Sequence, residues 1–152
     1  MKKFKFALGT VLSYKQQILD SLQAEHASAI AELRQQEQWL MKLQQDYGSF
    51  AAEYRQRCES GLEVREAITY QIKLRAREDD LKKENVKLKK LQKAEEEKRM
   101  QVVEAKKDTS SLEKLQEKQL KEYNAAAAKY EERFIEEFVS SKRIQSQEES
   151  QG

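Results

Sequence analysis

Hydrophobic residues recur along this chain at alternating steps of three and four, the spacing of one face of an α-helix. Ten of the fourteen positions in the first such series are apolar, against 38% of the whole chain. The series is Leu12, Lys15, Leu19, Leu22, His26, Ala29, Leu33, Gln36, Leu40, Leu43, Tyr47, Phe50, Tyr54 and Arg57. A repeat that averages 3.5 residues is typical of helices that pair as a left-handed coiled coil.

A second series has the same spacing, and twelve of its nineteen positions are apolar. It consists of Ala67, Tyr70, Leu74, Arg77, Leu81, Glu84, Leu88, Leu91, Glu95, Lys98, Val102, Ala105, Thr109, Leu112, Gln116, Gln119, Tyr123, Ala126 and Tyr130. The apolar stripe is thin over residues 92–101, where Ala94 and Met100 are the only apolar residues. We expect that portion to be loosely packed and washed by solvent.

A turn is predicted between the two series, at about residues 59–65. Ser60 and Glu63 have the spacing of a capping box, in which each side chain binds a free amide at the start of a helix, and Gly61 lies between them. Two other breaks compete with it. Ser110 and Glu113 repeat the capping-box spacing, and Gly48 interrupts the first series, although the aromatic residues keep their phase across it.

The predicted fold class is therefore all-α, a long antiparallel two-helix coiled-coil hairpin. One domain spans residues 1–140, with a first helix at about 5–58 and a second at about 66–140. The polar residues 141–152 are expected to be a disordered tail. The chain contains no proline, which suits long uninterrupted helices because proline removes a helical hydrogen bond.

The unequal helix lengths leave about residues 120–140 beyond the stretch that the first helix can cover. This overhang carries Tyr123, Tyr130, Phe134, Ile135, Phe138 and Val139. An apolar patch of this kind is normally covered or used for binding. Three coverings stay open: the N-terminal residues Phe4, Phe6 and Leu8, a second copy of the chain in a homodimer, or a dedicated partner.

The N-terminal stretch MKKFKFALGTVLSYKQQ has the basic start of a secretory signal. Lys5 and the pair Tyr14-Lys15 interrupt the apolar core that such a signal requires, and no small-residue cleavage site follows. We interpret the stretch as the first turns of a helix with Phe4, Leu8 and Leu12 on one face. No stretch approaches the ~20 apolar residues of a membrane span. A single cysteine excludes an intrachain disulfide and fits the cytoplasm.

Charge adds little to this picture, because the net charge is only +2. Residues 63–107 carry 14 basic and 10 acidic side chains, whereas residues 108–152 carry 7 and 10. The basic segment 73–93 could contact nucleic acid, yet acidic residues are interleaved and no aromatic residue is available to stack on bases. Membrane binding needs an apolar helix face that the hairpin already uses. We therefore expect neither nucleic-acid binding nor direct membrane insertion.

No pattern in the chain predicts catalysis, a metal site or a cofactor, so we do not expect an enzyme. His26 lies in the first series and is interpreted as a packed polar residue, and Cys58 has no histidine partner motif. No glycine-rich loop is present to hold a nucleotide phosphate. Trp39 lies beside Leu40 and is either an edge-packing residue or an anchor for a partner.

The two ends and the middle of the chain resemble the family of the flagellar export protein FliJ. The N-terminus matches a basic-aromatic F-x-F-x-L pattern followed by V-L and a basic or aromatic residue, here Phe4, Phe6, Leu8, Val11, Leu12 and Tyr14. FAAEYRQRCESG is similar to the aromatic run before the family's turn, and LEKLQEKQLKEYNAAAAKYEERFIEEFVSSK to its charged last helix. The chain has Glu136-Glu137-Phe138 where the family commonly ends in Asp-Glu and a small residue.

The resemblance implies a non-enzymatic component of the flagellar type III export apparatus, needed for flagellum biogenesis and hence for motility and chemotaxis. Its implied partners are the export ATPase ring, the cytoplasmic domain of the export gate and export chaperones. It implies a stalk that links ring to gate, located in the cytoplasm at the inner face of the cell membrane. A nucleic-acid-binding helical arm and a homo-oligomeric structural coiled coil remain alternatives.

Two sets of aromatic and aliphatic residues are the expected binding sites for these partners. The set expected to contact the ATPase is Phe4, Phe6, Leu8, Tyr123, Tyr130, Phe134 and Phe138. The set expected to contact the gate lies near the turn and consists of Tyr47, Phe50, Tyr54 and Tyr70. Several of these residues also belong to the helix-pairing series, so packing is the competing role.

Overall fold

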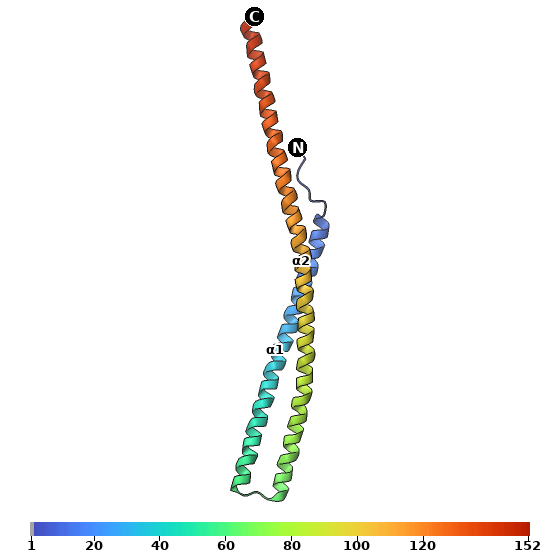
Figure 1. Ribbon diagram of the computed structural model, residues 1–152, viewed down its shortest axis with the longest axis vertical. Helices are drawn as coiled ribbons and strands as arrows, with labels where there is room; N and C mark the ends of the chain where they lie inside the picture. The colour runs from blue at the N-terminus through green and yellow to red at the C-terminus, as the bar shows by residue number, and fades with distance from the viewer. Residues whose placement is uncertain (1) are drawn as a thin grey trace. The chain divides into compact units, whose positions relative to one another are not determined.

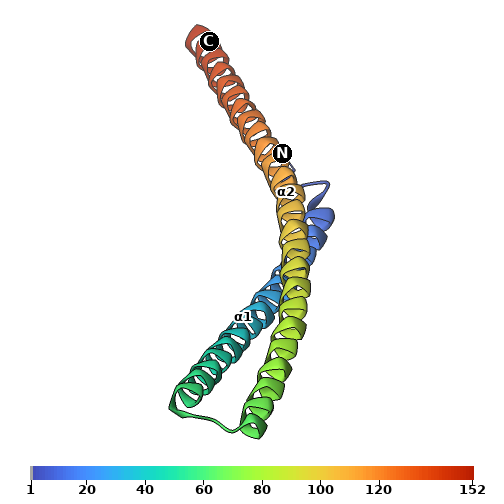
Figure 2. The same cartoon turned by 60° about the horizontal axis from the view of Figure 1, so that its bottom comes forward.

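The computed structural model describes residues 2–152 and consists of two long α-helices (Figure 1). Helix α1 spans Gly9–Ser60 and α2 spans Val64–Gln151. A short turn joins them, and in Figures 1 and 2 the last turns of α1 and the first turns of α2 lie beside each other in opposite directions. No strand occurs within residues 2–152. The predicted all-α helical hairpin is therefore confirmed.

The chain divides into two compact units. Residues 19–104 form one, which contains the turn and the helical stretches on either side of it. Residues 2–18 with residues 105–152 form the other, which contains the start of α1 and the end of α2. The sequence pattern predicts one continuous hairpin domain and does not reveal this division.

The faces on which the helices pair agree with the spacing of the two hydrophobic series. In the first series every position except Arg57 is buried or half-buried. In the second, every position except Ala126 and Tyr130 is buried or half-buried. The agreement includes polar members such as Gln36 and Thr109, which are 6% and 4% exposed. Position on the helix therefore decides burial even where the residue type is unfavourable.

Two helices alone cannot enclose a wide core. Among the described residues the apolar side chains that count as buried are Phe6, Leu12, Leu40 and Val102, and none is completely enclosed. Most other members of the two series stay half-exposed, so each contributes only part of the ~1.5–3 kcal/mol that full burial of a large apolar side chain supplies. Stability is spread along the helices instead of being concentrated in one cluster.

The thin portion of the second series is mostly exposed to solvent, as expected, and only Glu95 and Lys98 among residues 92–101 are half-buried. His26 Nε2 on α1 lies 3.0 Å from Glu95 Oε1 on α2, and both side chains are less than one-fifth exposed. Lys98 Nζ lies 2.6 Å from Glu25 Oε2. Ala94 and Met100, the apolar residues of this portion, are exposed. At its two half-buried positions, charged pairs between the helices take the place of apolar packing.

The amide of Gln36 makes a similar polar contact in a more enclosed position. Its Nε2 donates to the Glu84 carboxylate at 2.5 Å and to the Glu84 backbone carbonyl at 3.2 Å. A buried amide without partners would be costly, and removing one partner leaves the other unsatisfied. The pair therefore favours one alignment of α1 against α2 over a shifted one.

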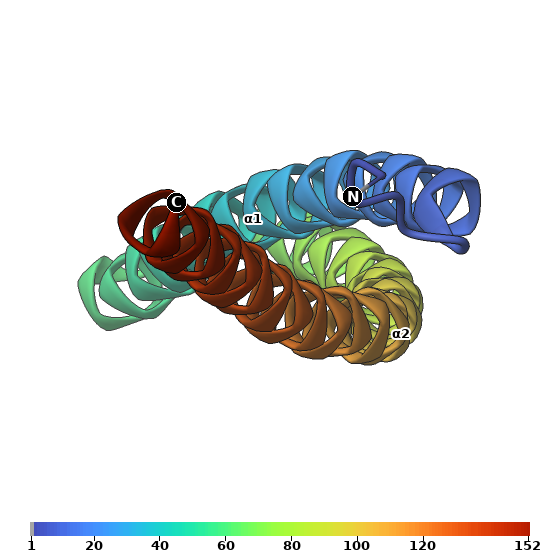
Figure 3. The same ribbon diagram turned by 90° about the horizontal axis from the view of Figure 1, so that it is seen from above.

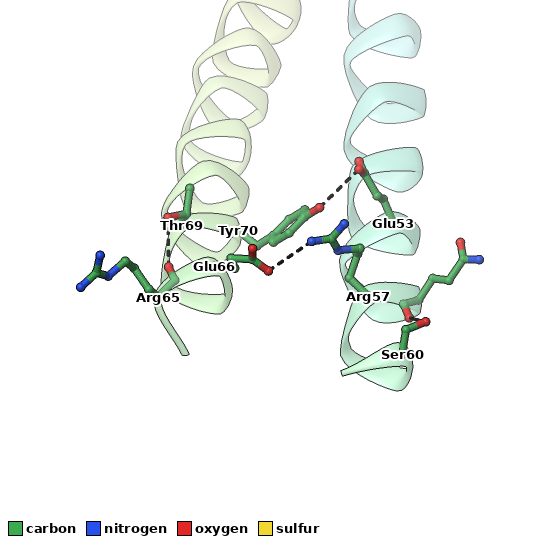
Figure 4. A network of polar contacts seen from close by, with 8 residues as sticks. Glu53, Arg57, Ser60, Arg65, Glu66, Thr69 and Tyr70 are labelled. Carbon is green, nitrogen blue, oxygen red and sulfur yellow. Dashed lines mark hydrogen bonds and ion pairs between the residues drawn. The ribbon is translucent and has the colours of Figure 1, made fainter. Parts of the chain in front are cut away.

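The turn is where the sequence predicts it, but the capping differs. Gly61 has a φ of 95°, the left-handed conformation that ends many helices. Ser60 is the last residue of α1, and its hydroxyl donates to the Gln56 carbonyl at 3.1 Å (Figure 4). The Glu63 carbonyl accepts the first bond of α2, from Ala67 N–H at 3.0 Å. The predicted capping box is wrong because Ser60 belongs to the preceding helix.

The competing breaks do not interrupt the helices. Gly48 and Ser49 lie inside α1, and Ser110 and Glu113 lie inside α2. An added Cβ at Gly48 would meet nothing within 4 Å, so this glycine is not required by close packing. The aromatic residues that keep phase across Gly48 therefore identified a continuous helix correctly.

Both outer helix ends differ from the prediction. Helix α1 begins at Gly9 instead of about residue 5, and residues 2–8 form an irregular segment that precedes it (Figures 1 and 3). The Gly9 N–H donates to the Phe6 carbonyl at 3.1 Å, which turns the chain into the helix. Phe4 and Leu8 therefore do not share a helical face with Leu12. Leaving the helix lets the Phe4 ring reach Tyr123, with centroids 5.6 Å apart.

At the other end, α2 continues to Gln151, so the segment expected to be a disordered tail is helical. Its glutamine, glutamate, lysine and arginine residues are good helix formers, and no glycine occurs within residues 141–151. Lys142 Nζ lies 5.0 Å from the centroid of the Phe138 ring one turn earlier. Every residue from 128 to 152 is exposed, so this part of α2 depends on local propensity and not on packing.

Replacing Gly61 tests the turn. We expect Gly61→Ala to destabilise the hairpin by about 1–2 kcal/mol, because an L-residue is strained at positive φ. Gly48→Ala is the matched control and should stabilise by about 0.5–1 kcal/mol, since it removes flexibility from a helix interior. Urea unfolding followed by circular dichroism measures both. A neutral or stabilising Gly61→Ala would contradict the assigned turn.

Candidate interaction surfaces

Histidine, cysteine and acidic side chains are the groups that most often form metal or catalytic sites. No group of three or more histidine, cysteine, aspartate or glutamate side chains within residues 2–152 is placed to hold a metal. His26 is engaged with Glu95, and Cys58 is exposed on α1. None of the described helices combines the length and hydropathy that crossing a bilayer requires. Surfaces for other macromolecules are therefore the features to consider.

Three of the four aromatic residues expected near the turn pack together, and the fourth, Tyr47, is linked to α2 by its hydrogen bond to Glu78. We call the four residues the turn-proximal cluster: Tyr47, Phe50, Tyr54 and Tyr70. The Tyr70 ring on α2 lies between two rings of α1, 5.2 Å from the centroid of Phe50 and 5.2 Å from that of Tyr54. Figure 4 shows Tyr70 pointing from α2 toward α1. Such tilted pairs add about 0.5–1.5 kcal/mol beyond the area that they bury.

Charged side chains contact these aromatic residues, both at a ring face and at the tyrosine hydroxyl groups. Arg77 Cζ lies 3.9 Å from the centroid of Phe50, and its Nε lies 3.0 Å from Asp46 Oδ2. The Tyr47 hydroxyl donates to Glu78 Oε1 at 2.7 Å, and that of Tyr70 to Glu53 at 3.3 Å. The cluster thus combines aromatic packing with hydrogen bonds and an ion pair between the helices.

Closer to the turn, Arg57 Nη2 lies 3.1 Å from Glu66 Oε2, which joins the last turn of α1 to the first turn of α2 (Figure 4). Arg57 is exposed although it belongs to the first series. At the turn end of the hairpin, its long side chain reaches from α1 to α2. Glu66 is also well placed to offset the positive end of the α2 dipole.

These contacts raise the pKa of two tyrosines above the usual 10.0. For Tyr47 the main cause is its hydrogen bond to Glu78, followed by burial and the Glu78 charge, since a phenolate would face a carboxylate. For Tyr70 the largest cause of the raised pKa is burial, followed by the Glu53 charge, and the Arg57 charge opposes the shift. The folded structure therefore favours the neutral, protonated form of both tyrosines.

The residues expected to contact the ATPase fall into a covered group and an exposed group. Phe4 and Tyr123 are brought together: their rings form a tilted pair, and the Tyr123 hydroxyl donates to the Lys2 carbonyl. Phe6 is buried. Leu8 stays partly exposed. The N-terminal residues therefore cover α2 as far as Tyr123.

Beyond that point the apolar residues of α2 stay uncovered. Tyr130, Phe134 and Phe138 are 56%, 63% and 55% exposed, and Ile135 and Val139 beside them are exposed too. Figures 1 and 2 show no part of residues 2–18 beside the last turns of α2. We call these five residues the exposed α2 stripe. Tyr130 and Phe134 continue the face that Tyr123 occupies, because helical residues three to four apart are neighbours.

The exposed α2 stripe contains a shallow groove and is flanked by acidic residues. Tyr130, Glu131, Phe134 and Ile135 line a shallow groove on it. Four glutamates, Glu131, Glu132, Glu136 and Glu137, alternate with the apolar residues. A complementary surface would therefore offer apolar pockets bordered by basic groups.

Sequence reasoning missed a third surface on α2. Val64, Ile68 and Ile72 are 77%, 52% and 65% exposed. Their spacing of four residues places them on one helix face, which is not the face that pairs with α1. The pattern could have been found by searching for a second periodic stripe out of phase with the first.

Comparison with protein families decides the assignment. The family model described as "Flagellar FliJ protein" matches residues 4–148, nearly the whole chain. The chain belongs to the FliJ family. The resemblance based on its ends and its middle is thus confirmed. No curated protein and no solved structure matches the chain.

Membership of the FliJ family implies a role related to flagellar protein export. It also implies a non-catalytic component that associates with the flagellar export apparatus. The Asp-Glu ending expected of the family is replaced here by Glu136-Glu137-Phe138, which lies within the matched range. This departure therefore does not remove the chain from the family.

The raised pKa of Tyr47 predicts how the hairpin responds to alkali. The contribution of the phenol is fully present below pH 10 and is lost as pH rises through the raised pKa. Wild type should therefore lose stability above about pH 10 faster than Tyr47→Phe, which cannot ionise. Urea unfolding over a pH series measures the difference.

Glu78→Gln tests whether Glu78 causes the raised pKa of Tyr47. It keeps an acceptor oxygen beside the phenol and removes the charge, so the alkaline loss of stability should again be smaller than in wild type. If the difference between wild type and Tyr47→Phe did not change with pH, the contact with Glu78 would not couple ionisation of the phenol to folding.

Proposed function

We propose that this protein is a non-enzymatic stalk of the flagellar type III export apparatus, linking the export ATPase ring to the export gate and assisting export and chaperone handling. The observation that carries the proposal is the exposed α2 stripe in a chain of the FliJ family. A helix with large apolar side chains in water is suited to enter another protein's groove. A binding role is proposed because membership of the FliJ family implies a non-catalytic component of flagellar export.

The exposed α2 stripe is the proposed contact for the ATPase. Phe4 packs against Tyr123 of α2, so the free surface begins beyond Tyr123, while Phe6 is buried and Leu8 is exposed near the start of α1. Tyr130, Phe134 and Phe138 then supply the large side chains that dominate most interfaces. The N-terminal residues are thus assigned a positioning role, and the three exposed aromatics a direct one.

The turn-proximal cluster is the proposed contact for the gate. Its rings are half-buried, so they pack the helices together while leaving edges and hydroxyl groups at the surface. Tyr54 is the most suitable contact residue, because its hydroxyl accepts only a long 3.4 Å hydrogen bond from Gln71 Nε2. The proposal therefore gives these residues a second role in addition to packing.

Removing the exposed aromatics tests the ATPase contact. Phe134→Ala combined with Phe138→Ala should weaken binding to the purified export ATPase at least about tenfold, since hot-spot aromatics each contribute about 2 kcal/mol or more. Helicity should be retained, because neither ring packs against residues 2–18. Trp39→Ala, which removes an exposed aromatic from α1, is the control and should leave the affinity unchanged. Unchanged binding by the double variant would remove this assignment.

A reciprocal experiment separates the two contacts. Tyr54→Ala should weaken binding to the cytoplasmic domain of the gate at least about tenfold and leave ATPase binding intact, because Tyr54 supplies the ring edge and hydroxyl proposed as a hot spot. The Phe134 and Phe138 double variant should do the opposite. Circular dichroism checks that Tyr54→Ala still folds. Equal losses toward both partners would indicate general unfolding and contradict a separate gate surface.

A further inference from the structure

We propose that the outward face of α2 between Val64 and Lys93 binds the surface of an anionic phospholipid membrane. The proposal rests on the surface alone and not on the stalk function. Residues 64–93 contain ten basic and five acidic side chains. What matters is which of these charges point away from α1.

Three of the five carboxylates are engaged with α1. Glu66 pairs with Arg57 at 3.1 Å, Glu78 accepts from Tyr47 at 2.7 Å, and Glu84 accepts from Gln36 at 2.5 Å. Arg77 is the basic residue turned toward α1, against Asp46 and Phe50. Nine basic side chains remain exposed on α2, of which Lys73 and Lys87 line hollows beside α1 and seven do not. Asp79 and Asp80 oppose them in the same segment. The mixed charge of the sequence thus becomes a strongly basic outer face.

Aliphatic side chains alternate with these basic groups. Val64, Ile68, Ile72 and Val86 are all more than half exposed. Spacings of three or four residues place them on one face with the basic residues Arg75, Lys82, Lys83, Lys90 and Lys93. The face extends over roughly 45 Å at 1.5 Å per residue. Helices that lie on a membrane combine apolar residues, which enter the headgroup region, with lysines, which meet anionic lipids.

The side chains on this face favour lipid over nucleic acid. Tyr70 is the only aromatic residue between positions 64 and 93, and it stacks on Phe50 and Tyr54. No ring is therefore available to stack on bases. Exposed valine and isoleucine gain nothing from a phosphate backbone but gain from the apolar boundary of a bilayer. Because only four aliphatic residues contribute, binding should be reversible and sensitive to salt.

Vesicle flotation of the full-length protein tests the proposal. The protein should float with phosphatidylcholine vesicles that contain phosphatidylglycerol and remain behind with phosphatidylcholine alone. Replacing Lys82, Lys83, Lys90 and Lys93 with glutamine should lower partitioning at least about tenfold, because each lysine near an anionic surface contributes favourably. The control replaces Lys106, Lys114, Lys118 and Lys121, which are exposed outside this segment, and changes the net charge equally. It should partition within about twofold of wild type.

A fluorescence experiment tests contact of the aliphatic residues with lipid. With Trp39→Phe removing the native tryptophan, Ile72→Trp should shift its emission to the blue when anionic vesicles are added. Both variants change exposed positions, and circular dichroism verifies their helicity. Absence of a shift would overturn the proposal. Equal loss of binding in the two quadruple lysine variants would also overturn it, as would tighter binding to a DNA or RNA oligonucleotide than to vesicles.

Discussion

The pairing of α1 with α2 along one narrow face is the constraint on which the hairpin depends. Helices in water gain most of their stability from packing, and here each helix has a single partner. Few apolar side chains are buried, so the polar members of the face also matter. The contacts of Gln36 with Glu84 and of His26 with Glu95 fill positions where apolar packing is missing. Alignment of the helices thus depends on apolar spacing and on a few polar pairs together.

That same pairing sorts the remaining surface into faces with different properties. Carboxylates such as Glu66 and Glu78 are held against α1, which leaves the outward face of α2 basic. The N-terminal residues cover α2 up to Tyr123, which leaves the aromatic residues beyond it exposed. Neither surface is evident from composition, because both result from which neighbours the helix contacts. The pairing of two helices is therefore enough to create distinct exposed surfaces.

Much of this fold could be predicted from the sequence, since the spacing of apolar residues identifies the paired faces and the turn. Burial of Gln36 and Thr109 follows from position alone. The helix ends were harder to predict. Ser60 and Glu63 have capping-box spacing, but Ser60 is the last residue of α1, which ends at the left-handed Gly61, so its hydroxyl bonds within α1 and does not cap α2. Residues 141–151 looked disordered because they have nothing to bury, although their helix propensity is high. The outward stripe at Val64, Ile68 and Ile72 was missed because one face had already explained the periodicity.

The central functional claim is that the exposed α2 stripe is a binding surface for the export ATPase. It is tested most directly in living cells by placing a photoreactive phenylalanine analogue at position 134 and identifying the protein that becomes crosslinked by mass spectrometry. The same analogue at position 39 serves as the control. The account predicts an adduct with the export ATPase from position 134 and not from position 39. Adducts only with a second copy of the chain, or the same adducts from both positions, would contradict it.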